Sequence, residues 1–354
     1  MKKAIALLLS LVMILSVLSG CAGSSGQETP QDPEPADVSE APAVDDGRSR
    51  PSNSGRLRVI DGKLYSQSGE SVMLRGVSSI SLVVAGDLLN EALFEELSRD
   101  VGVNLFRLAM YTYGVGTIGY CTDGDKEYHK QLIDRGVELC RANDMYVLID
   151  WHILSDGDPN RYVDEAKAFF AEMAEKYASY DNVLYEICNE PNGVDWPTVK
   201  TYAEAVIPVI REKSPDAVII VGNPDWDKDL RSVLADPLDF DNILYTFHFY
   251  SATHGQEWRD VVEEVSRAGL PIFVSEFGVT ASTGGQPRDL DSADEWIALL
   301  ERERISWCMW SFSKSPEASA AVRSTVLKYN GFTTEDYSKT GLWLLETLSA
   351  NATR

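Results

Sequence analysis

The chain is poor in basic residues. Its 354 residues include 32 Lys and Arg against 55 Asp and Glu, a formal net charge of −23. This deficit excludes a nucleic-acid partner, because binding to phosphates needs a surplus of Lys and Arg, and it disfavours a polyanionic substrate. A neutral ligand such as a polysaccharide is not affected by the charge, and an acidic surface favours solubility.

Histidine is scarce, and several catalytic motifs are missing. Neither His-x-His nor His-Glu-x-x-His occurs among His129, His152, His248 and His254, so we expect no catalytic metal site, while a structural ion such as Ca²⁺ is left open. His129 falls in a predicted helix, where we expect it to face solvent. No Gly-x-Gly-x-x-Gly follows the first predicted strand, and no Gly-x-Ser-x-Gly elbow occurs. A dinucleotide site and a serine hydrolase are therefore disfavoured, and we expect no cofactor.

Cysteine is limited to five residues without Cys-x-x-Cys spacing. Cys188 and Cys308 lie in apolar, strand-like runs, where a free thiol behaves as a small hydrophobic side chain. Whether Cys121, Cys140, Cys188 and Cys308 form a disulfide is left open, because connectivity cannot be deduced from sequence.

The one long apolar run, from Ala4 to Leu18, follows two lysines and precedes Ser19-Gly20-Cys21. It is typical of a secretory signal and shorter than the roughly 20 residues of a spanning helix. Its end is similar to a bacterial lipobox, so residues 1–21 are predicted to be a lipoprotein signal peptide and Cys21 to be lipidated. The localisation expected is extracellular, anchored to the bacterial cell membrane through Cys21. Residues 22–55, rich in Pro, Ser and acidic side chains, are predicted to form a disordered tether.

Residues 56–350 show the pattern of one folded domain. Segments 57–65 and 71–75 predict a small N-terminal β-hairpin region with a turn at Asp61-Gly62. Eight apolar runs then alternate with amphipathic stretches, which predicts a (β/α)8 TIM barrel. The predicted strands are 73–78, 103–110, 145–151, 183–189, 217–222, 243–249, 271–277 and 305–311. The predicted helices include 126–143, 164–179, 197–213, 256–268 and 291–303.

Polar side chains stand at the ends of six predicted strands, where barrels of this kind place their chemistry. They are Arg107, Asp150 with His152, Asn189 with Glu190, His248 with Tyr250, Glu276, and Trp310. Each taken singly has a structural explanation, such as a salt bridge or core packing. Together they are hard to explain as core, because they all reach the same rim.

Two of these residues, Glu190 and Glu276, end mostly apolar strands. Carboxylates are rarely buried unless they are paired or used. The pair fits the acid/base and the nucleophile of a retaining glycosidase. An Arg or Tyr beside the nucleophile would favour its charged form, and a Trp face suits a sugar ring. Trp226 and Trp258 extend this stacking floor or are ordinary surface; the sequence leaves this open.

Three segments resemble glycoside hydrolase family 5 of the cellulase A type, in its bacterial endoglucanase branch. They are 149–160 (IDWHILSDGDPN), 185–191 (YEICNEP) and 272–278 (IFVSEFG), and the resemblance spans residues 57–347. It implies that Glu190 is the acid/base and Glu276 the nucleophile. It also implies supporting roles: Arg107 and Tyr250 hold Glu276, Asn189 meets the 2-hydroxyl of the reacting sugar, His152 and His248 line its subsite, and Trp310 is the stacking platform.

The chain departs from the family pattern at two places. Relatives carry a His and a Trp where this chain has residues 80–84 (ISLVV), and those residues contact sugars on the non-reducing side. Lys314 arrives one place early and Pro316 follows it. Lys314 and Glu317 are still expected to reach a distal sugar.

These observations predict a retaining endo-β-1,4-glucanase, a glycosidase that hydrolyses O-glycosyl bonds of a β-1,4-linked polysaccharide and works as a monomer. The same mechanism on β-mannan, xyloglucan or mixed-linkage glucan is the alternative, because the residues at 80–84 differ. A non-catalytic, surface-anchored sugar-binding lipoprotein is the alternative of another class, but the presence of both glutamates speaks against it.

Overall fold

A computed structural model describes residues 46–114, 116 and 118–351. The predicted signal peptide, Cys21 and the predicted tether as far as residue 45 lie outside this range, so those predictions stay predictions. None of the helices within the described ranges is long and apolar enough to cross a membrane.

The last ten residues of the predicted tether belong to the fold, which corrects the boundary placed at residue 55. Arg50 is fully buried and precedes a short helix, α1 (Pro51–Ser54). Its guanidinium pairs with Asp46 at 2.7 Å and donates to the backbone oxygen of Ser98 at 2.9 Å. Composition did not reveal this anchor, because one arginine among polar residues leaves the average unchanged.

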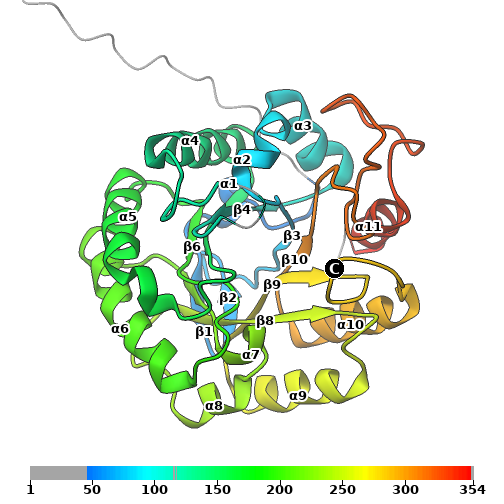
Figure 1. Ribbon diagram of the computed structural model, residues 1–354. Helices are drawn as coiled ribbons and strands as arrows, with labels where there is room; N and C mark the ends of the chain where they lie inside the picture. The colour runs from blue at the N-terminus through cyan, green and yellow to red at the C-terminus, as the bar shows by residue number, and fades with distance from the viewer. Residues whose placement is uncertain (1–45, 115, 117, 352–354) are drawn as a thin grey trace, which may run out of the picture. The chain divides into compact units, whose positions relative to one another are not determined.

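Eight parallel strands close into a barrel in the order β10-β3-β4-β5-β6-β7-β8-β9, and helices surround them (Figure 1). All eight predicted strands are confirmed. Their bounds are β3 (Arg75–Ser78), β4 (Leu105–Tyr111), β5 (Tyr146–His152), β6 (Val183–Glu186), β7 (Ile219–Val221), β8 (Ile243–Tyr250), β9 (Ile272–Gly278) and β10 (Trp307–Trp310).

The five predicted helices are confirmed to within a few residues, because each has a long apolar face. They are α4 (Lys126–Ala142), α5 (Val163–Lys176), α6 (Trp196–Lys213), α9 (Gln256–Arg267) and α10 (Leu290–Glu303). Most of the elements that were not predicted are too short for a periodic signal. They are α2 (Leu82–Ala85), η1 (Gly86–Leu88), α3 (Glu91–Glu96), η2 (Leu97–Val101), η3 (Pro159–Tyr162), α7 (Pro224–Asp227), α8 (Leu230–Ala235) and the longer α11 (Lys339–Ala350).

The N-terminal hairpin is confirmed as β1 (Arg58–Ile60) paired antiparallel with β2 (Lys63–Tyr65). Asp61 and Gly62 both have positive φ, 49° and 75°, as a two-residue hairpin turn requires. Leu64 of this hairpin belongs to one buried cluster with the interior residues of the barrel strands. The hairpin therefore closes the N-terminal end of the barrel with apolar side chains.

Alternation along each strand divides the barrel interior into layers. On β4, Leu105 belongs to the apolar layer at the N-terminal end, Arg107 lies above it, and Ala109 belongs to a small cluster with Tyr250 and Trp310. Since side chains of a strand alternate between faces, every second residue reaches the interior. The interior thus changes from apolar to charged toward the carboxyl ends.

Two other expectations can be checked in the described residues. Cys121, Cys140, Cys188 and Cys308 are all free thiols, so the disulfide left open above is not formed. The expectation that His129 faces solvent is wrong: its side chain is 1% exposed. Its Nδ1 lies 3.0 Å from the Asp125 oxygen, and the ring of Tyr120 covers it edge-on at 5.8 Å.

Candidate active site

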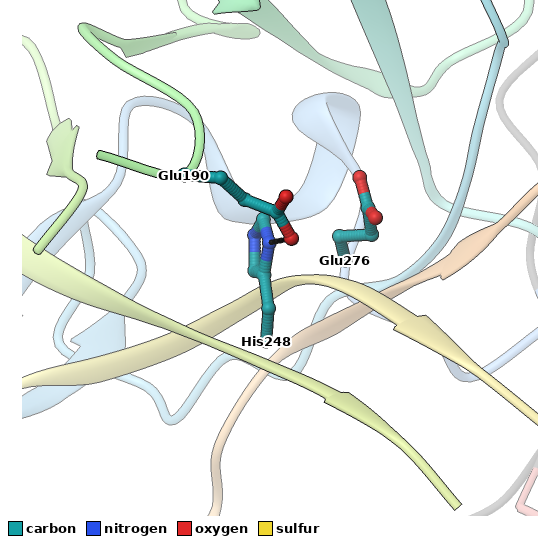
Figure 2. Close-up of side chains that lie close together, drawn as sticks. All are labelled: Glu190, His248 and Glu276. Atoms are coloured by element: carbon teal, nitrogen blue, oxygen red, sulfur yellow. Dashed lines mark hydrogen bonds and ion pairs between the residues drawn. The ribbon is translucent and has the colours of Figure 1, made fainter. Parts of the chain in front are cut away.

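Glu190, Glu276 and His248 meet at the carboxyl end of the barrel (Figure 2). One oxygen of each carboxylate and a ring nitrogen of His248 all lie within 4.8 Å of one another. Retaining glycosidases keep their two carboxyl groups about 5–5.5 Å apart, whereas inverting enzymes need about 6.5–9.5 Å for a water molecule. The separation is therefore of the retaining kind.

A β-bulge turns Glu276 into the barrel. Thr246 of β8 pairs with Phe273 of β9, but His248 pairs with Glu276, so two steps on β8 oppose three on β9. The extra residue breaks the alternation, and both Ser275 and Glu276 make hydrogen bonds inside the barrel. Bulges near active sites re-aim side chains in this way.

Both oxygens of Glu276 are held by donors. Arg107 Nη1 donates to Oε2 at 3.0 Å, and the Tyr250 hydroxyl donates to Oε1 at 2.7 Å. Burial and the neighbouring Glu276 raise the pKa of Tyr250 well above its usual value, so the phenol keeps its proton. The carboxylate is thus fixed in position, 5% exposed, at the floor of the cleft.

Glu190 lies just beyond β6, in a different environment. Burial raises the pKa of its carboxyl, while His152, Lys228 and Arg107 oppose the shift. A raised pKa keeps a carboxyl protonated and able to act as an acid near neutral pH. His248 Nδ1 lies 3.0 Å from Oε1, and burial lowers the pKa of His248 to about 3, so the ring is neutral.

The backbone of Glu190 is fixed as well. Its φ is 23°, a conformation that side-chain-bearing residues rarely adopt. Its N–H donates to Asp227 Oδ2 at 3.0 Å, and the other oxygen of Asp227 accepts from the Asn223 N–H at 2.6 Å. Asp227 is fully buried, so the turn that presents Glu190 is tied to α7.

Arg107 is the centre of the charged layer beneath the cleft. Its guanidinium contacts Asp150 at 3.0 Å, Glu186 at 2.7 Å and Glu276 at 3.0 Å, and it donates to Asn189 Oδ1 at 2.8 Å. Burial disfavours a charged guanidinium, but the three carboxylates outweigh it and raise the pKa of Arg107 well above its usual value. Burial also raises the pKa of Asp150 to about 7, against the pull of Arg107.

Stacked rings form one wall of the site. The His152 ring lies parallel to Tyr111, with centroids 4.6 Å apart, and nearly parallel to Trp310 at 5.4 Å. His152 Nδ1 is 2.7 Å from Asp150 Oδ2, which fixes the plane of the ring. Trp310 is 8% exposed and lines the cleft. It offers a flat apolar face beside the two glutamates.

The cleft has a volume of about 340 Å³ and contains most of the predicted residues. His152, Glu190, Tyr250, Glu276, Trp310 and Glu317 line it, together with Ile80, Ser81 and Val84. Arg107, Asn189 and His248 lie directly beneath, each at most 2% exposed. A larger cavity of about 820 Å³, beside the paired Arg75 and Glu301, holds none of the predicted residues.

Lys314 and the two outer tryptophans differ from expectation in part. Lys314 is not among the residues that line the cleft; its Nζ lies 3.8 Å above the Tyr329 ring and donates to the Lys328 oxygen. Trp258 is packing, with its ring 6.2 Å from that of Phe247. Trp226 is 49% exposed, on the short α7 that also carries Asp227.

Four polar residues of the site received no role from the sequence: Asp150, Glu186, Asp227 and Ser275. Asp150 was noted beside His152 at the end of its strand but received no role, and Glu186 had a usable signal, because it interrupts an apolar strand three residues before Asn189. Asp227 had none, since it lies in a four-residue helix with three successive positive φ values, 58°, 55° and 60° at positions 225–227.

A Gly-x-Gly-x-x-Gly spacing does occur, at Gly114, Gly116 and Gly119, after the second barrel strand. It does not open a helix, because α4 begins only at Lys126. A dinucleotide site needs the helix N-terminus directly after the glycines, so this stretch does not provide one.

Comparison with known proteins assigns the family. Residues 65–316 match the family model "Cellulase (glycosyl hydrolase family 5)". The chain is 43% identical over 299 residues to endoglucanase A of Butyrivibrio fibrisolvens, covering 83% of this chain and 69% of that protein. It is 38% identical over 301 residues to an endoglucanase of Clostridium saccharobutylicum, covering 84% of this chain and 66% of that protein.

A solved structure agrees in fold and sequence. The catalytic domain of the Thermobifida fusca endoglucanase Cel5A, in complex with cellotetraose, superposes with a TM-score of 0.81 at 34% identity. The match covers 85% of this chain and all of that one. With the closed barrel and the two facing glutamates, these matches show that the chain belongs to glycosyl hydrolase family 5.

Proposed function

We propose that this protein is a retaining endo-β-1,4-glucanase. The observation that carries the proposal is the pair Glu190 and Glu276, which face each other in one cleft in unlike environments. Burial favours the protonated form of Glu190, whereas two donors hold the oxygens of Glu276. The endoglucanases matched above and the cellotetraose in the related structure support a β-1,4-glucan as substrate.

In the first step, Glu276 attacks the anomeric carbon while Glu190 gives its proton to the departing glycosidic oxygen. The glycosidic bond breaks, and a glycosyl ester forms on Glu276. Arg107 and Tyr250 keep the attacking carboxylate aimed at the cleft. Trp310 offers its face to the sugar ring, and Asn189 is proposed to meet the 2-hydroxyl.

In the second step, Glu190 is a carboxylate and acts as a base. It takes a proton from a water molecule whose oxygen attacks the anomeric carbon, and the ester bond to Glu276 breaks. The product keeps its original anomeric configuration, and Glu190 regains its proton. The pH–rate profile is expected to fall on its basic limb as Glu190, whose pKa is raised by burial, loses the proton that it must donate.

The test is hydrolysis of soluble carboxymethyl-cellulose by the purified protein, with product sizing and NMR of the fresh anomeric signal. We expect a rapid fall in polymer length and a β-configured product. An α-configured first product would contradict retention, and Glu276→Ala with unchanged turnover would contradict an enzyme that uses this pair. A non-catalytic sugar-binding lipoprotein would instead show no hydrolysis in the wild type, and Glu276→Ala would barely affect its sugar binding.

A second substrate class has an observation of its own. Ile80 and Val84 line the cleft, in the segment where the resemblance to family 5 implies a His and a Trp, and Val84 is 59% exposed. Aliphatic side chains there weaken polar recognition of glucose on the non-reducing side. A panel of β-mannan, xyloglucan and mixed-linkage glucan decides the matter, since cleavage of mannan without cleavage of carboxymethyl-cellulose would replace the glucanase proposal.

We also propose that the protein is an extracellular lipoprotein, anchored by lipid on Cys21 and tethered by the acidic segment that follows. The order of charged, apolar and small residues before Cys21 supports this. Fatty-acid labelling of the wild type and of Cys21→Ala tests it, and label retained in the variant would contradict it. The proposed monomeric state is tested by light scattering of the purified protein.

A further inference from the structure

A row of hydrogen-bonded side chains, here called the file, leads from Glu190 into the barrel interior. Its members are Glu190, His248, Ser275 and Glu186. His248 Nδ1 is 3.0 Å from Glu190 Oε1, and His248 Nε2 is 2.9 Å from Ser275 Oγ. Ser275 Oγ is 2.5 Å from Glu186 Oε1. We propose that Glu186 is a positioning residue for Glu190, because it determines, through Ser275, which ring nitrogen of His248 carries the proton. The proposal rests on the proposed function only in naming Glu190 the acid/base.

The direction of the file follows from the single hydroxyl proton of Ser275. Burial raises the pKa of Glu186, and Arg107, whose Nε donates to Glu186 Oε2 at 2.7 Å, opposes this shift and favours an ionised Glu186. A 2.5 Å contact between hydroxyl and carboxylate oxygens is typical of a charge-assisted O–H···O⁻ bond. Ser275 therefore donates to Glu186, and its oxygen accepts from other groups. Thr246 Oγ1, 2.5 Å away, supplies one such donor.

His248 supplies the other. A neutral imidazole has one N–H, and the ring is neutral because it is 2% exposed and its pKa is lowered to about 3 by burial. With Ser275 as its acceptor, that N–H is on Nε2. Nδ1 is then a bare acceptor that faces Glu190.

This tautomer affects Glu190 in both chemical steps. A protonated Glu190 donates to Nδ1, and a glycosidic oxygen then competes for that proton. An ionised Glu190 has only a lone pair opposite Oε1, so the carboxylate is the less favoured form. Glu190 therefore retains its proton until substrate takes it, and the carboxylate left behind is a stronger base toward water.

Other charged groups also face these residues. Around Glu190 these groups are Arg107 of β4, His152 of β5, Asp227 of α7, Lys228 at the end of α7, and Glu276 of β9. Around Glu186 they are Arg107, Asp150 of β5 and His248 of β8. Asp227 is the main competitor, because its Oδ2 is 3.4 Å from His248 Nδ1 and an ionised Asp227 would favour the opposite tautomer. Burial, followed by repulsion from Glu190, raises the pKa of Asp227 well above its usual value, which keeps it from doing so.

Glu186→Gln reverses the file with almost no change in shape. The amide oxygen must still accept from Arg107, so the amide NH₂ faces Ser275 as a donor. The Ser275 hydroxyl then donates to His248 Nε2, and the ring proton moves to Nδ1, where it stabilises an ionised Glu190. The direct readout is ¹⁵N NMR of histidine-labelled protein, which distinguishes the two tautomers and is practical because the chain has four histidines.

We expect His248 to be protonated on Nε2 in the wild type and on Nδ1 in Glu186→Gln. The basic limb of the pH profile of kcat/KM should move down by about 1 unit in this variant, because a hydrogen bond to the charged form lowers a pKa. Ser275→Ala, which cuts the file, should move it in the same direction. Glu301→Gln is the matched control: Glu301 is paired with Arg75 at 2.5 Å, outside the cleft, and its profile should coincide with the wild type.

An Nδ1–H tautomer in the wild type, or basic limbs in Glu186→Gln and Ser275→Ala that match the wild type, would overturn the proposal. The NMR result needs no turnover, so it is decided even if the protein proves inactive on glucans. Folding of each variant is checked by its melting curve, and the Ser275→Ala result stands if Glu186→Gln does not fold.

Discussion

The two ends of the barrel interior differ in polarity: one is lined by apolar side chains and the other by charged ones. At the N-terminal end, Leu105, Leu148 and Leu184 pack against Leu64 of the hairpin, fully or nearly fully buried. At the carboxyl end, the next inward positions on the same strands are Arg107, Asp150 and Glu186. The N-terminal end is stabilised by apolar packing alone, and the carboxyl end holds several carboxylates around one guanidinium. Stability and reactivity are thus separated along the same strands, only two residues apart.

The largest effect is expected at the reactive end. Glu276→Ala should reduce turnover by several orders of magnitude, because the variant has no carboxylate at this position to form the glycosyl ester. Hydrolysis of carboxymethyl-cellulose measures it. If the variant kept substantial activity after contaminating wild type had been excluded, the assignment of catalysis to the carboxyl end of the barrel would be contradicted.

Glu190→Ala should be the next most damaging change. General acid catalysis contributes about 10²–10⁴-fold, and we expect a loss of this size on polysaccharide. An aryl cellobioside whose phenol leaves without protonation should show a much smaller loss in its first step. Equal losses on both substrates would assign Glu190 a role other than proton donor.

The apolar end is expected to show the reverse behaviour. Leu148→Ala should cost about 2–5 kcal/mol of unfolding free energy, as large-to-small changes in a packed core do. The kcat of the molecules that remain folded should stay close to wild type, because Leu148 does not line the cleft. Denaturant unfolding gives the first quantity and initial rates at low temperature the second. A kcat loss that exceeds the unfolded fraction would mean that the two ends are coupled.

A pH-dependent effect on stability is expected at Asp150. Its pKa is raised to about 7 in the fold and is about 3.9 in an unfolded chain. Between these values the folded state holds the proton and the unfolded state does not, so this group's stabilising contribution is complete below about pH 4 and is lost as pH rises through 7. The melting temperature of Asp150→Asn relative to wild type should therefore rise from pH 4.5 to 7.5. A constant difference across that interval would contradict the shift.

The smallest effect is expected on the outer surface. Arg231 and Glu264 pair at 2.6 Å but are 60% and 54% exposed. Glu264→Gln should leave the unfolding free energy almost unchanged, since solvent screens exposed ion pairs. Its cost should fall well below that of Leu148→Ala when both are measured by denaturant unfolding.

How far the sequence predicts this molecule depends on the length of the signal. Strands such as β5 carry continuous apolar runs and helices such as α4 carry long periodic patterns, and their bounds were predicted to within a few residues. The rim residues followed from their position after those strands. Arg50, His129 and Asp227 could not be predicted, because their burial depends on contacts with segments distant in sequence or on a short turn. Lys314 differs for a related reason: a neighbouring ring and carbonyl hold its ammonium group.

The extra residue in β9 has a consequence for engineering. Side chains of a strand alternate between its two faces, and this insertion reverses the alternation after it, so that Phe277 joins the outer core while Glu276 lines the cleft. Deleting residue 274 or 275 would leave the composition of the strand almost intact, but it would turn Glu276 outward and Phe277 inward. Grafting this strand onto another barrel must therefore preserve the count of residues and not only their identity.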